Sequence, residues 1–150
     1  MKTTVRYLFL CFLSVSAVLA VILAMSGCTM LGIGGGGTTR LSSSPTLPAV
    51  DGRAKFTATK NDNTRIELTV KHLPHPGKLT PPANTYVVWT RATKYGPVQN
   101  MGALMVDKNL NGKLVTETAL HSFELFITAE DSGQIQEPLG QSLLWMNYNR

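Results

Sequence analysis

The chain has 150 residues, of which 14 are Lys or Arg and 9 are Asp or Glu, so its formal net charge is +5 at pH 7. Basic and acidic residues alternate along the sequence, and no basic stripe of the kind that binds nucleic acid is visible, so we expect no nucleic-acid partner. The hydrophobic content of 43% is raised by one apolar segment near the N-terminus, and the remainder has the composition of an ordinary globular domain.

The first 28 residues have the pattern of an export signal. A short basic head precedes an apolar stretch over residues 7–25, and small residues follow it directly before a cysteine. The ending Met25-Ser26-Gly27-Cys28 resembles the lipobox of bacterial lipoproteins, although Met25 stands where leucine is usual. This resemblance implies that residues 1–27 are a cleaved lipoprotein signal peptide and that Cys28 carries lipid.

Two forms of membrane attachment remain open for this segment. Several acyl chains on Cys28 would anchor the chain stably, whereas an uncleaved signal anchor of ~20 apolar residues would span the bilayer. Both forms place the C-terminal part outside the cytoplasm, because Lys2 and Arg6 hold the N-terminus inside. Thr29 replaces the aspartate that commonly retains lipoproteins in the inner membrane. We therefore expect a cell-envelope location, on the periplasmic side of the outer membrane.

Signal cleavage would also determine the cysteine chemistry and the net charge. Cys11 lies inside the signal, and the lipid would occupy Cys28. The exported part would then have no thiol for a disulfide, a thiolate metal site or a cysteine nucleophile. Removal of Lys2 and Arg6 would lower the formal net charge from +5 to +3.

Residues 28–50 have the composition of a flexible tether that follows the lipidated cysteine. They contain four consecutive glycines at positions 34–37 and the run Ser42-Ser43-Ser44-Pro45, which offer little apolar surface to bury. A flexible coil of ~22 residues has an r.m.s. reach of roughly 25 Å. We place the folded domain at residues 51–150.

Residues 51–150 alternate apolar and polar side chains, with turn residues between the alternating segments, which predicts an all-β domain. In the clearest strand, residues 64–71, Ile66, Leu68 and Val70 share one face. Six further strands are predicted at 53–58, 85–90, 101–106, 113–116, 123–128 and 142–146. Turns are predicted at 61–63, 95–97 and 111–112, and longer loops at 73–83 and 131–140. Seven short strands indicate a small β-sandwich, with a small barrel as the alternative.

The large side chains can be assigned to faces from the same alternation. Trp89 is expected between the two sheets, with Tyr86 and Val88 on the opposite face of its strand. Four other side chains are expected on outer faces, where they would form an exposed apolar partner surface: Met101, Met105, Phe126 and Met146. A shift of one residue in the register would reverse each of these assignments.

Three segments together are similar to the extracytoplasmic domain of anti-sigma-K factors. They are residues 86–89, 100–104 and 123–130, the last followed by Pro138-Leu139-Gly140. Those proteins have a Tyr-x-x-Trp-type strand, a Leu-Gly strand, and a Val-Thr-x-Glu strand before a Pro-x-Gly loop. The similarity covers residues 85–144 and implies an immunoglobulin-like sandwich. It does not imply control of a sigma factor, because the chain has no room for a cytoplasmic sigma-binding domain.

Residues 107–112 copy the first half of a calcium-binding loop. Asp107, Asn109 and Asn111 supply oxygen atoms at the first, third and fifth positions, and Gly112 stands at the sixth. The twelfth position, which requires a bidentate glutamate, is Thr118, and Glu117 misses it by one residue. A polar hairpin turn is the simpler interpretation of this motif, with calcium binding as the alternative.

The other candidate sites lack the groups that their chemistry needs. His72, His75 and His121 have no cysteine or nearby carboxylate to complete a tetrahedral metal site. No Gly-x-Ser-x-Gly turn is present, and the dispersed carboxylates, including Glu130 and Asp131, give no reason to expect a catalytic pair. We therefore expect no catalytic residue, no metal and no cofactor.

These patterns favour a non-catalytic binding or scaffolding module that is anchored in the cell envelope. An unknown envelope protein or polymer would bind to a sheet face or to the proline-rich loop at residues 73–83. The alternative function is a sensor or carrier domain for a small ligand or calcium.

Overall fold

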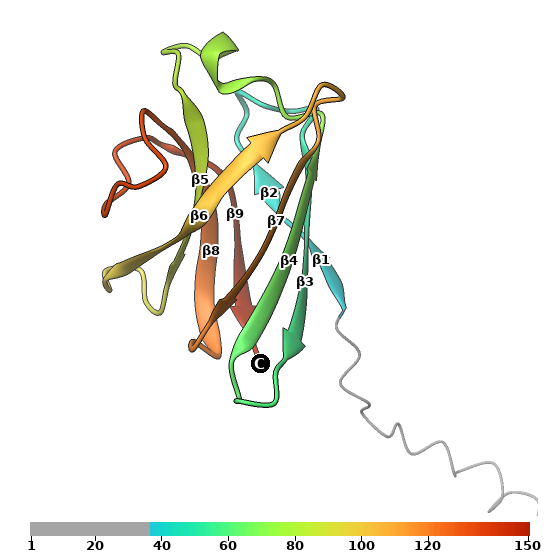
Figure 1. Ribbon diagram of the computed structural model, residues 1–150, viewed down its shortest axis with the longest axis vertical. Coiled ribbons are helices and arrows are strands. Elements are labelled where there is room, and N and C mark those ends of the chain that lie inside the picture. Colours follow the sequence, from blue (N-terminus) through green and yellow to red (C-terminus); the bar gives the residue numbers. More distant parts are fainter. Residues whose placement is uncertain (1–36) are drawn as a thin grey trace, which may run out of the picture. The chain divides into compact units, whose positions relative to one another are not determined.

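The computed structural model describes residues 37–150, which belong to one compact unit, Gly34–Arg150. The predicted signal peptide, Cys28 and the first part of the predicted tether lie outside the described residues. Within residues 37–150 the only helical element is the short 3-10 turn η1 (Pro76–Lys78), and the rest consists of strands and loops (Figure 1). The prediction of an all-β domain is confirmed. No helix in this part of the chain is long and apolar enough to cross a membrane.

The described residues form nine strands rather than the seven that the sequence predicts. Seven strands have seven to nine residues each, and they coincide with the seven predicted segments: β3 (Asp51–Ala58), β4 (Thr64–Lys71), β5 (Thr85–Arg91), β6 (Val98–Val106), β7 (Gly112–Thr118), β8 (Ser122–Glu130) and β9 (Ser142–Asn149). The two additional strands, β1 (Thr38–Arg40) and β2 (Ser42–Ser43), are short and lie in the predicted tether.

The strands form one antiparallel sheet in the order β1-β3-β4-β7-β6-β5-β8-β9-β2, which folds over into two layers (Figure 1). β1, β3, β4 and β7 make one layer, and β5, β8, β9 and β2 make the other. β6 joins the layers, because its residues 98–104 pair with β5 and its residues 105–106 pair with β7. Gly102, with a φ of 121°, lies in β6 shortly before this change of partner.

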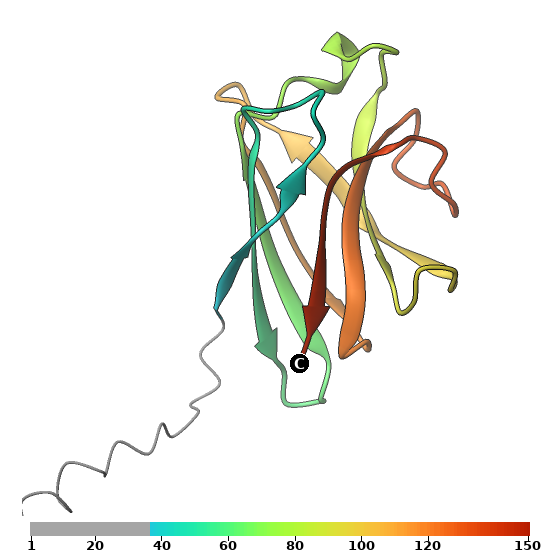
Figure 2. The same cartoon turned by 180° about the vertical axis from the view of Figure 1, so that it is seen from behind.

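Residues 38–43 bridge the two ends of this sheet. β1 pairs with β3 and β2 pairs with β9, so one short segment crosses obliquely from one layer to the other (Figure 2). Leu41, between the two strands, is buried in the main core together with Leu47 and Val50. The folded unit therefore includes residues that we assigned to the tether, and the predicted boundary at Asp51 differs from the structure. These three apolar residues are too widely spaced in a polar stretch to give a strand signal.

The main core fills the space between the two layers. Ile66, Leu68 and Val70 point into it from β4, as the alternation predicts. The opposite layer contributes Tyr86, Val88, Phe123, Leu125 and Ile127. Within residues 37–150 this core draws on residues from Leu41 to Tyr148, and Gly34–Arg150 is one compact unit.

The assignment of Trp89 to the space between the sheets is wrong. Tyr86 and Val88 face the main core, whereas Trp89 and Phe126 lie on the outer face of the β5–β8 layer in a second, smaller cluster. In β5 the alternation between the two faces was predicted correctly, but the face that points to the core was inverted. In β8 the outward position of Phe126 was predicted correctly. Ile135, from the loop at residues 131–141, packs against this cluster, so the tryptophan is completely buried.

The expected exposed patch of Met101, Met105, Phe126 and Met146 is also largely wrong, since Phe126 lies on the outer face but is only 2% exposed. Met101 and Met146 belong to the main core, and only Met105 is exposed, with 82% of its surface accessible. The register between β5 and β6 shifts at Val88 and Trp89, which leaves Met101 as an extra residue in β6 and reverses the expected alternation. Met146 lies directly opposite Leu125, whose side chain faces the core.

Candidate functional site

An open groove of about 880 Å³ lies between the proline-rich loop and the loop at residues 131–141. Three groups of residues line it: Pro74, Leu79, Pro81 and Pro82 from the first loop, Ile135, Leu139 and Gly140 from the second, and Ala129, Glu130 and Leu143 at the ends of β8 and β9. The proline-rich loop was predicted as a partner surface, and the structure places it in one wall of this groove. The opposite wall was not predicted.

The proline-rich wall is held by contacts with the main core and with β5. Leu73 and Pro76 are buried, and the Ala83 backbone N–H donates to the Pro76 carbonyl at 3.1 Å. The Tyr86 hydroxyl donates a hydrogen bond of 2.8 Å to the Pro74 carbonyl. Burial raises the pKa of Tyr86 from 10.0 to about 12, so the hydroxyl keeps its proton and remains a donor well into the alkaline range.

The opposite wall is held by the carboxylate of Glu130. This side chain is only 4% exposed, and it is the only buried charged residue among residues 37–150. Its Oε1 atom accepts hydrogen bonds from the backbone N–H groups of Leu139 and Gly140, both at 3.1 Å, and from the Thr128 hydroxyl at 2.6 Å. A buried carboxylate needs such donors to offset its lost hydration, and here two of them belong to the groove wall.

Two side-chain amides and one glycine complete the attachment of the second loop. Asn100 in β6 donates to the carbonyl groups of Gly133 and Ile135, at 3.0 and 2.8 Å. Asn84 donates to the Asp131 carbonyl at 3.1 Å. A Cβ atom at Gly140 would lie 2.5 Å from the Ala129 carbonyl oxygen, so a larger residue would push the wall away from β8. Both walls are therefore fixed to the sheet before any partner binds.

Only a weak signal in the sequence pointed to this anchoring. Glu130 appeared there as half of a possible carboxylate pair with Asp131 and as the end of a segment that resembles anti-sigma-K domains. In the structure its partners are backbone amides nine and ten residues further on. No local sequence pattern identifies an acceptor whose donors lie in a following loop.

The calcium-like motif forms the turn between β6 and β7. Asp107 Oδ1 accepts hydrogen bonds from the backbone amides of Asn109 and Asn111, both at 2.8 Å. The pKa of Asp107 lies below its ordinary value. The hydrogen bond from the Asn111 amide is the largest cause, and the bond from Asn109 adds to it. Thr118, the twelfth position, is buried at the other end of β7, roughly 20 Å along an extended strand. This geometry is that of a capped hairpin turn.

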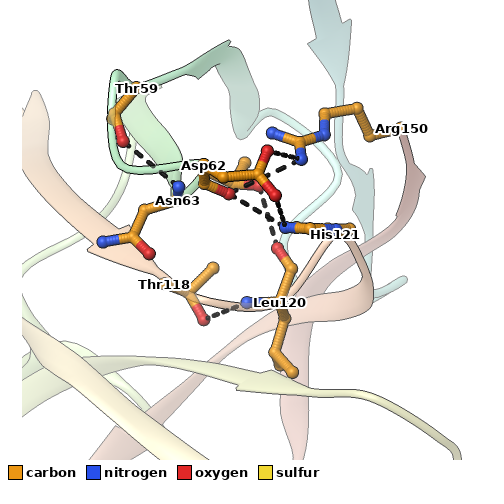
Figure 3. A network of polar contacts seen from close by, with 8 residues as sticks. Thr59, Asp62, Asn63, Thr118, Leu120, His121 and Arg150 are labelled. Carbon is orange, nitrogen blue, oxygen red and sulfur yellow. Dashed lines mark hydrogen bonds and ion pairs between the residues drawn. The ribbon is translucent and has the colours of Figure 1, made fainter.

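The three histidines do not come together. His72 and His75 follow the end of β4, whereas His121 lies beside Asp62 in the turn that precedes β4. The length of β4, roughly 25 Å, separates the two positions. His121 Nε2 lies 2.9 Å from the Asp62 carbonyl oxygen, and Arg150 pairs with the Asp62 carboxylate, so this cluster fastens the C-terminus to the β3–β4 turn (Figure 3).

The titratable residues give no metal site within residues 37–150. No group of three or more His, Cys, Asp or Glu side chains in this part of the chain could hold a metal ion. A second hollow, of about 420 Å³, lies near the Arg91–Glu124 ion pair, whose atoms Nε and Oε2 are 2.7 Å apart. Arg91 and Glu124 neutralise each other there and leave Lys94 as the other charged residue of the lining. The first groove has about twice the volume and two anchored walls, so it is the better candidate site.

Comparisons with known proteins identify no family for this chain. No protein-family model matches it, and a search of curated proteins finds no match. The similarity to the extracytoplasmic domain of anti-sigma-K factors stays a prediction.

Proposed function

We propose that this protein is a non-catalytic binding module of the cell envelope and that its binding site is the groove between the two loops. The partner is an extended segment of another envelope protein or of an envelope polymer. Lipid on Cys28 holds the module to the membrane, on the periplasmic side of the outer membrane in our proposal. The observation that carries this function is the groove itself, with two walls that are both fixed to the sheet.

The chemistry of the groove suits an extended partner. Prolines supply an apolar wall that loses little conformational freedom on binding. Leu139 stands in the other wall with 86% of its surface exposed, and its backbone N–H donates to the buried Glu130 carboxylate. Together with the prolines of the opposite wall it gives the groove an apolar lining with a few polar groups, as binding sites commonly have.

The strand order supports an immunoglobulin-like sandwich, which is the fold that we propose. Taken in sequence, the seven long strands place the first, second and fifth in one layer and the third, sixth and seventh in the other, with the fourth between them. Immunoglobulin domains have this order. Such sandwiches commonly serve as recognition modules, although the fold alone does not define a function.

A non-catalytic role agrees with the polar groups around the groove. Glu130 is the buried carboxylate at this site, and its Oε1 atom already accepts three hydrogen bonds that hold the wall. These bonds give the carboxylate a structural role that accounts for its burial. The arrangement therefore suits binding better than catalysis.

Site-specific photo-crosslinking in intact cells tests the proposal. A photo-reactive residue at position 139 should capture a specific envelope component, whereas the same residue at Tyr95 should not. Tyr95 is a matched control, because it is 91% exposed and lies in the turn between β5 and β6, outside the groove lining. The Cys28→Ala variant should lose the adduct if the anchor brings the two partners together. Identical adducts at both positions, or none at position 139, would contradict the proposal.

A small-ligand carrier is the second candidate, and the size of the groove favours it. Small-molecule sites commonly have volumes of about 300–1,000 Å³, and this groove lies within that range. Binding of a small ligand would raise the unfolding temperature of the purified unit by mass action. A rise with soluble envelope extracts from which macromolecules have been removed, together with no adduct at position 139, would favour this alternative.

A further inference from the structure

The outer faces of the two layers differ in what covers them. The loop at residues 131–141 packs over the β5–β8 face and buries Trp89 and Phe126. Among residues 37–150, no loop lies over the outer face of β1, β3, β4 and β7 (Figure 1). Its side chains at alternate positions, such as Lys55 in β3 and Lys113 in β7, are exposed. We call this outer face, together with Met105 of β6, the basic face.

The positive charge of the described unit is concentrated on the basic face. Six cations lie there, Arg40, Arg53, Lys55, Arg65, Lys71 and Lys113, together with three anions, Asp51, Glu67 and Glu117. The remaining residues of 37–150 include six cations and six anions, so the excess of three positive charges belongs to this face alone. Basic and acidic residues alternate along the sequence, so this excess on one face is not visible there. The expectation that the positive charge is scattered is therefore wrong.

Cross-strand pairing arranges part of this charge in a row. Arg40 lies opposite Arg53, Arg53 lies opposite Thr69, and Thr69 lies opposite Lys113. The row ends at Met105, which lies opposite Lys113. Residues directly opposite in neighbouring strands point to the same face, so three cations and one exposed methionine form a band across the layer.

The anions on this face neutralise arginines and leave the lysines without an ion-pair partner. Asp51 contacts Arg40 and Arg53, each at 3.0 Å, and Glu67 and Glu117 contact Arg65 at 3.4 and 3.6 Å. Within residues 37–150, Lys55, Lys71 and Lys113 form no ion pair. Three exposed ammonium groups are therefore available to an external anion.

Apolar side chains accompany these lysines. Met105 is 82% exposed and Val115, two residues after Lys113, is 56% exposed. Neither hollow described above includes a residue of this face, whose exposed side chains spread over four strands and Met105. Exposed lysines beside apolar groups are typical of proteins that lie on anionic membranes, where charge attraction and shallow apolar insertion act together.

We propose that the basic face docks on a membrane surface that contains anionic lipids. The choice of a membrane over other anionic partners rests on the proposed function, which keeps the unit close to a bilayer. The loop at residues 131–141, which forms one wall of the groove, packs on the opposite layer. A unit that lies on its basic face would therefore leave that wall accessible to a partner.

Vesicle flotation with the purified unit from Gly34 to Arg150 tests this docking without any contribution from a lipid on Cys28. The unit should bind vesicles of phosphatidylcholine mixed with phosphatidylglycerol, and should not bind vesicles of phosphatidylcholine alone. Added salt should weaken the binding, because it screens exposed charges. Replacement of the three unpaired lysines in K55Q/K71Q/K113Q should weaken binding by on the order of 100-fold. Met105→Ser should give a smaller loss.

The matched control is K60Q/K94Q/K108Q, which removes the same charge from exposed lysines in turns outside the basic face. It should retain most of the binding. Equal losses in the two triple variants, equal binding to neutral vesicles, or binding to a soluble polyanion such as heparin but not to vesicles would overturn the proposal. Crosslinking at position 139 in the full chain reports on the groove separately, so failure of one proposal is distinguishable from failure of the other.

Discussion

Trp89 Nε1 donates a hydrogen bond of 2.9 Å to Thr128 Oγ1, and the same hydroxyl donates one of 2.6 Å to Glu130 Oε1. Trp89 and Thr128 are completely buried on neighbouring strands β5 and β8. The three side chains form a chain of hydrogen bonds from the outer cluster to the amides of the groove wall. The hydroxyl of Thr128 is its central link, because it both accepts and donates.

Thr128→Val should destabilise the unit by about 2–3 kcal/mol, since it leaves the buried Trp89 N–H without an acceptor and removes one donor from Glu130. Thr90→Val is the matched control, because Thr90 is equally buried in β5 but donates only to the Met101 sulfur, at 3.3 Å. The control should lose less than about 1 kcal/mol. Urea unfolding measures both values, and equal losses would contradict the role of the hydrogen-bond chain.

The raised pKa of Tyr86 predicts a loss of stability in alkali. Between pH 10.0, its ordinary pKa, and about 12, the unfolded chain releases the phenolic proton while the folded unit retains it. The contribution of the Tyr86 phenol to the free energy of unfolding is therefore fully present below pH 10.0. It falls as pH rises towards 12, by at most about 2–3 kcal/mol.

Tyr86→Phe separates this effect from other alkaline titrations. At pH 8 the variant should be less stable than the native protein by about 1 kcal/mol, because the Pro74 carbonyl loses its donor. The difference should shrink or change sign above pH about 11, since only the native side chain titrates. Urea unfolding at several pH values gives the comparison, and a constant difference across them would refute the prediction.

Leu41→Ala should destabilise the unit by about 2–4 kcal/mol, because Leu41 is 4% exposed and fills the main core between β1 and β2. Leu139→Ala, the same truncation at a side chain that is 86% exposed, should change stability by less than about 0.5 kcal/mol. Thermal and urea unfolding measure both. A negligible effect at Leu41 would mean that residues 38–50 are a tether, as the sequence suggested.

Asp107→Ala should lower the unfolding temperature at pH 7, since the carboxylate caps the turn with two hydrogen bonds. Because the pKa of Asp107 is lowered in the folded unit, this contribution is present above its ordinary value of 3.8 and is lost as pH falls below it. The difference between native and variant should accordingly disappear in acid.

Calcium should not raise the unfolding temperature of either the native protein or the Asp107→Ala variant, because the twelfth loop position lies at the far end of β7. Asp131→Ala is the charge-matched control for the turn. The Asp131 contact that holds the loop is made by its backbone carbonyl, which the substitution retains. A calcium-dependent rise that Asp107→Ala abolishes would show that the turn is a metal site.

The seven long strands could be predicted from the sequence because each has a local signal. Period-two alternation in β4 is visible in eight consecutive residues, and the turn residues on either side mark its ends. The Asn111-Gly112 pair correctly predicted a hairpin. An Asn-Gly pair usually does so because its two residues adopt positive φ, but here the reason is different. Leu110 adopts the positive φ of 59°, whereas Gly112 leaves room for Leu104, whose Cγ atom would lie 2.9 Å from an added Cβ.

The features that sequence reasoning missed depend on contacts between distant residues. The inward and outward faces of β5 are both buried, so alternation there cannot distinguish the core from the outer cluster of Trp89. Glu130 finds its donors in a loop, and the lysines of the basic face come together only when β3, β4 and β7 pair. Such relationships follow from the register, which no single segment determines.

The bridge at residues 38–43 sets an order of events during folding. Ser42 pairs with Trp145, about a hundred residues further along the chain, and pairings of this range form late because the intervening loop must first close. The chain is made from its N-terminus, so β2 exists before any of its partner strand does. β1 can pair with β3 as soon as that strand is made, but β2 must wait for β9, the last strand of the unit. Until β9 arrives, the segment around Leu41 is therefore held by strand pairing at one end only.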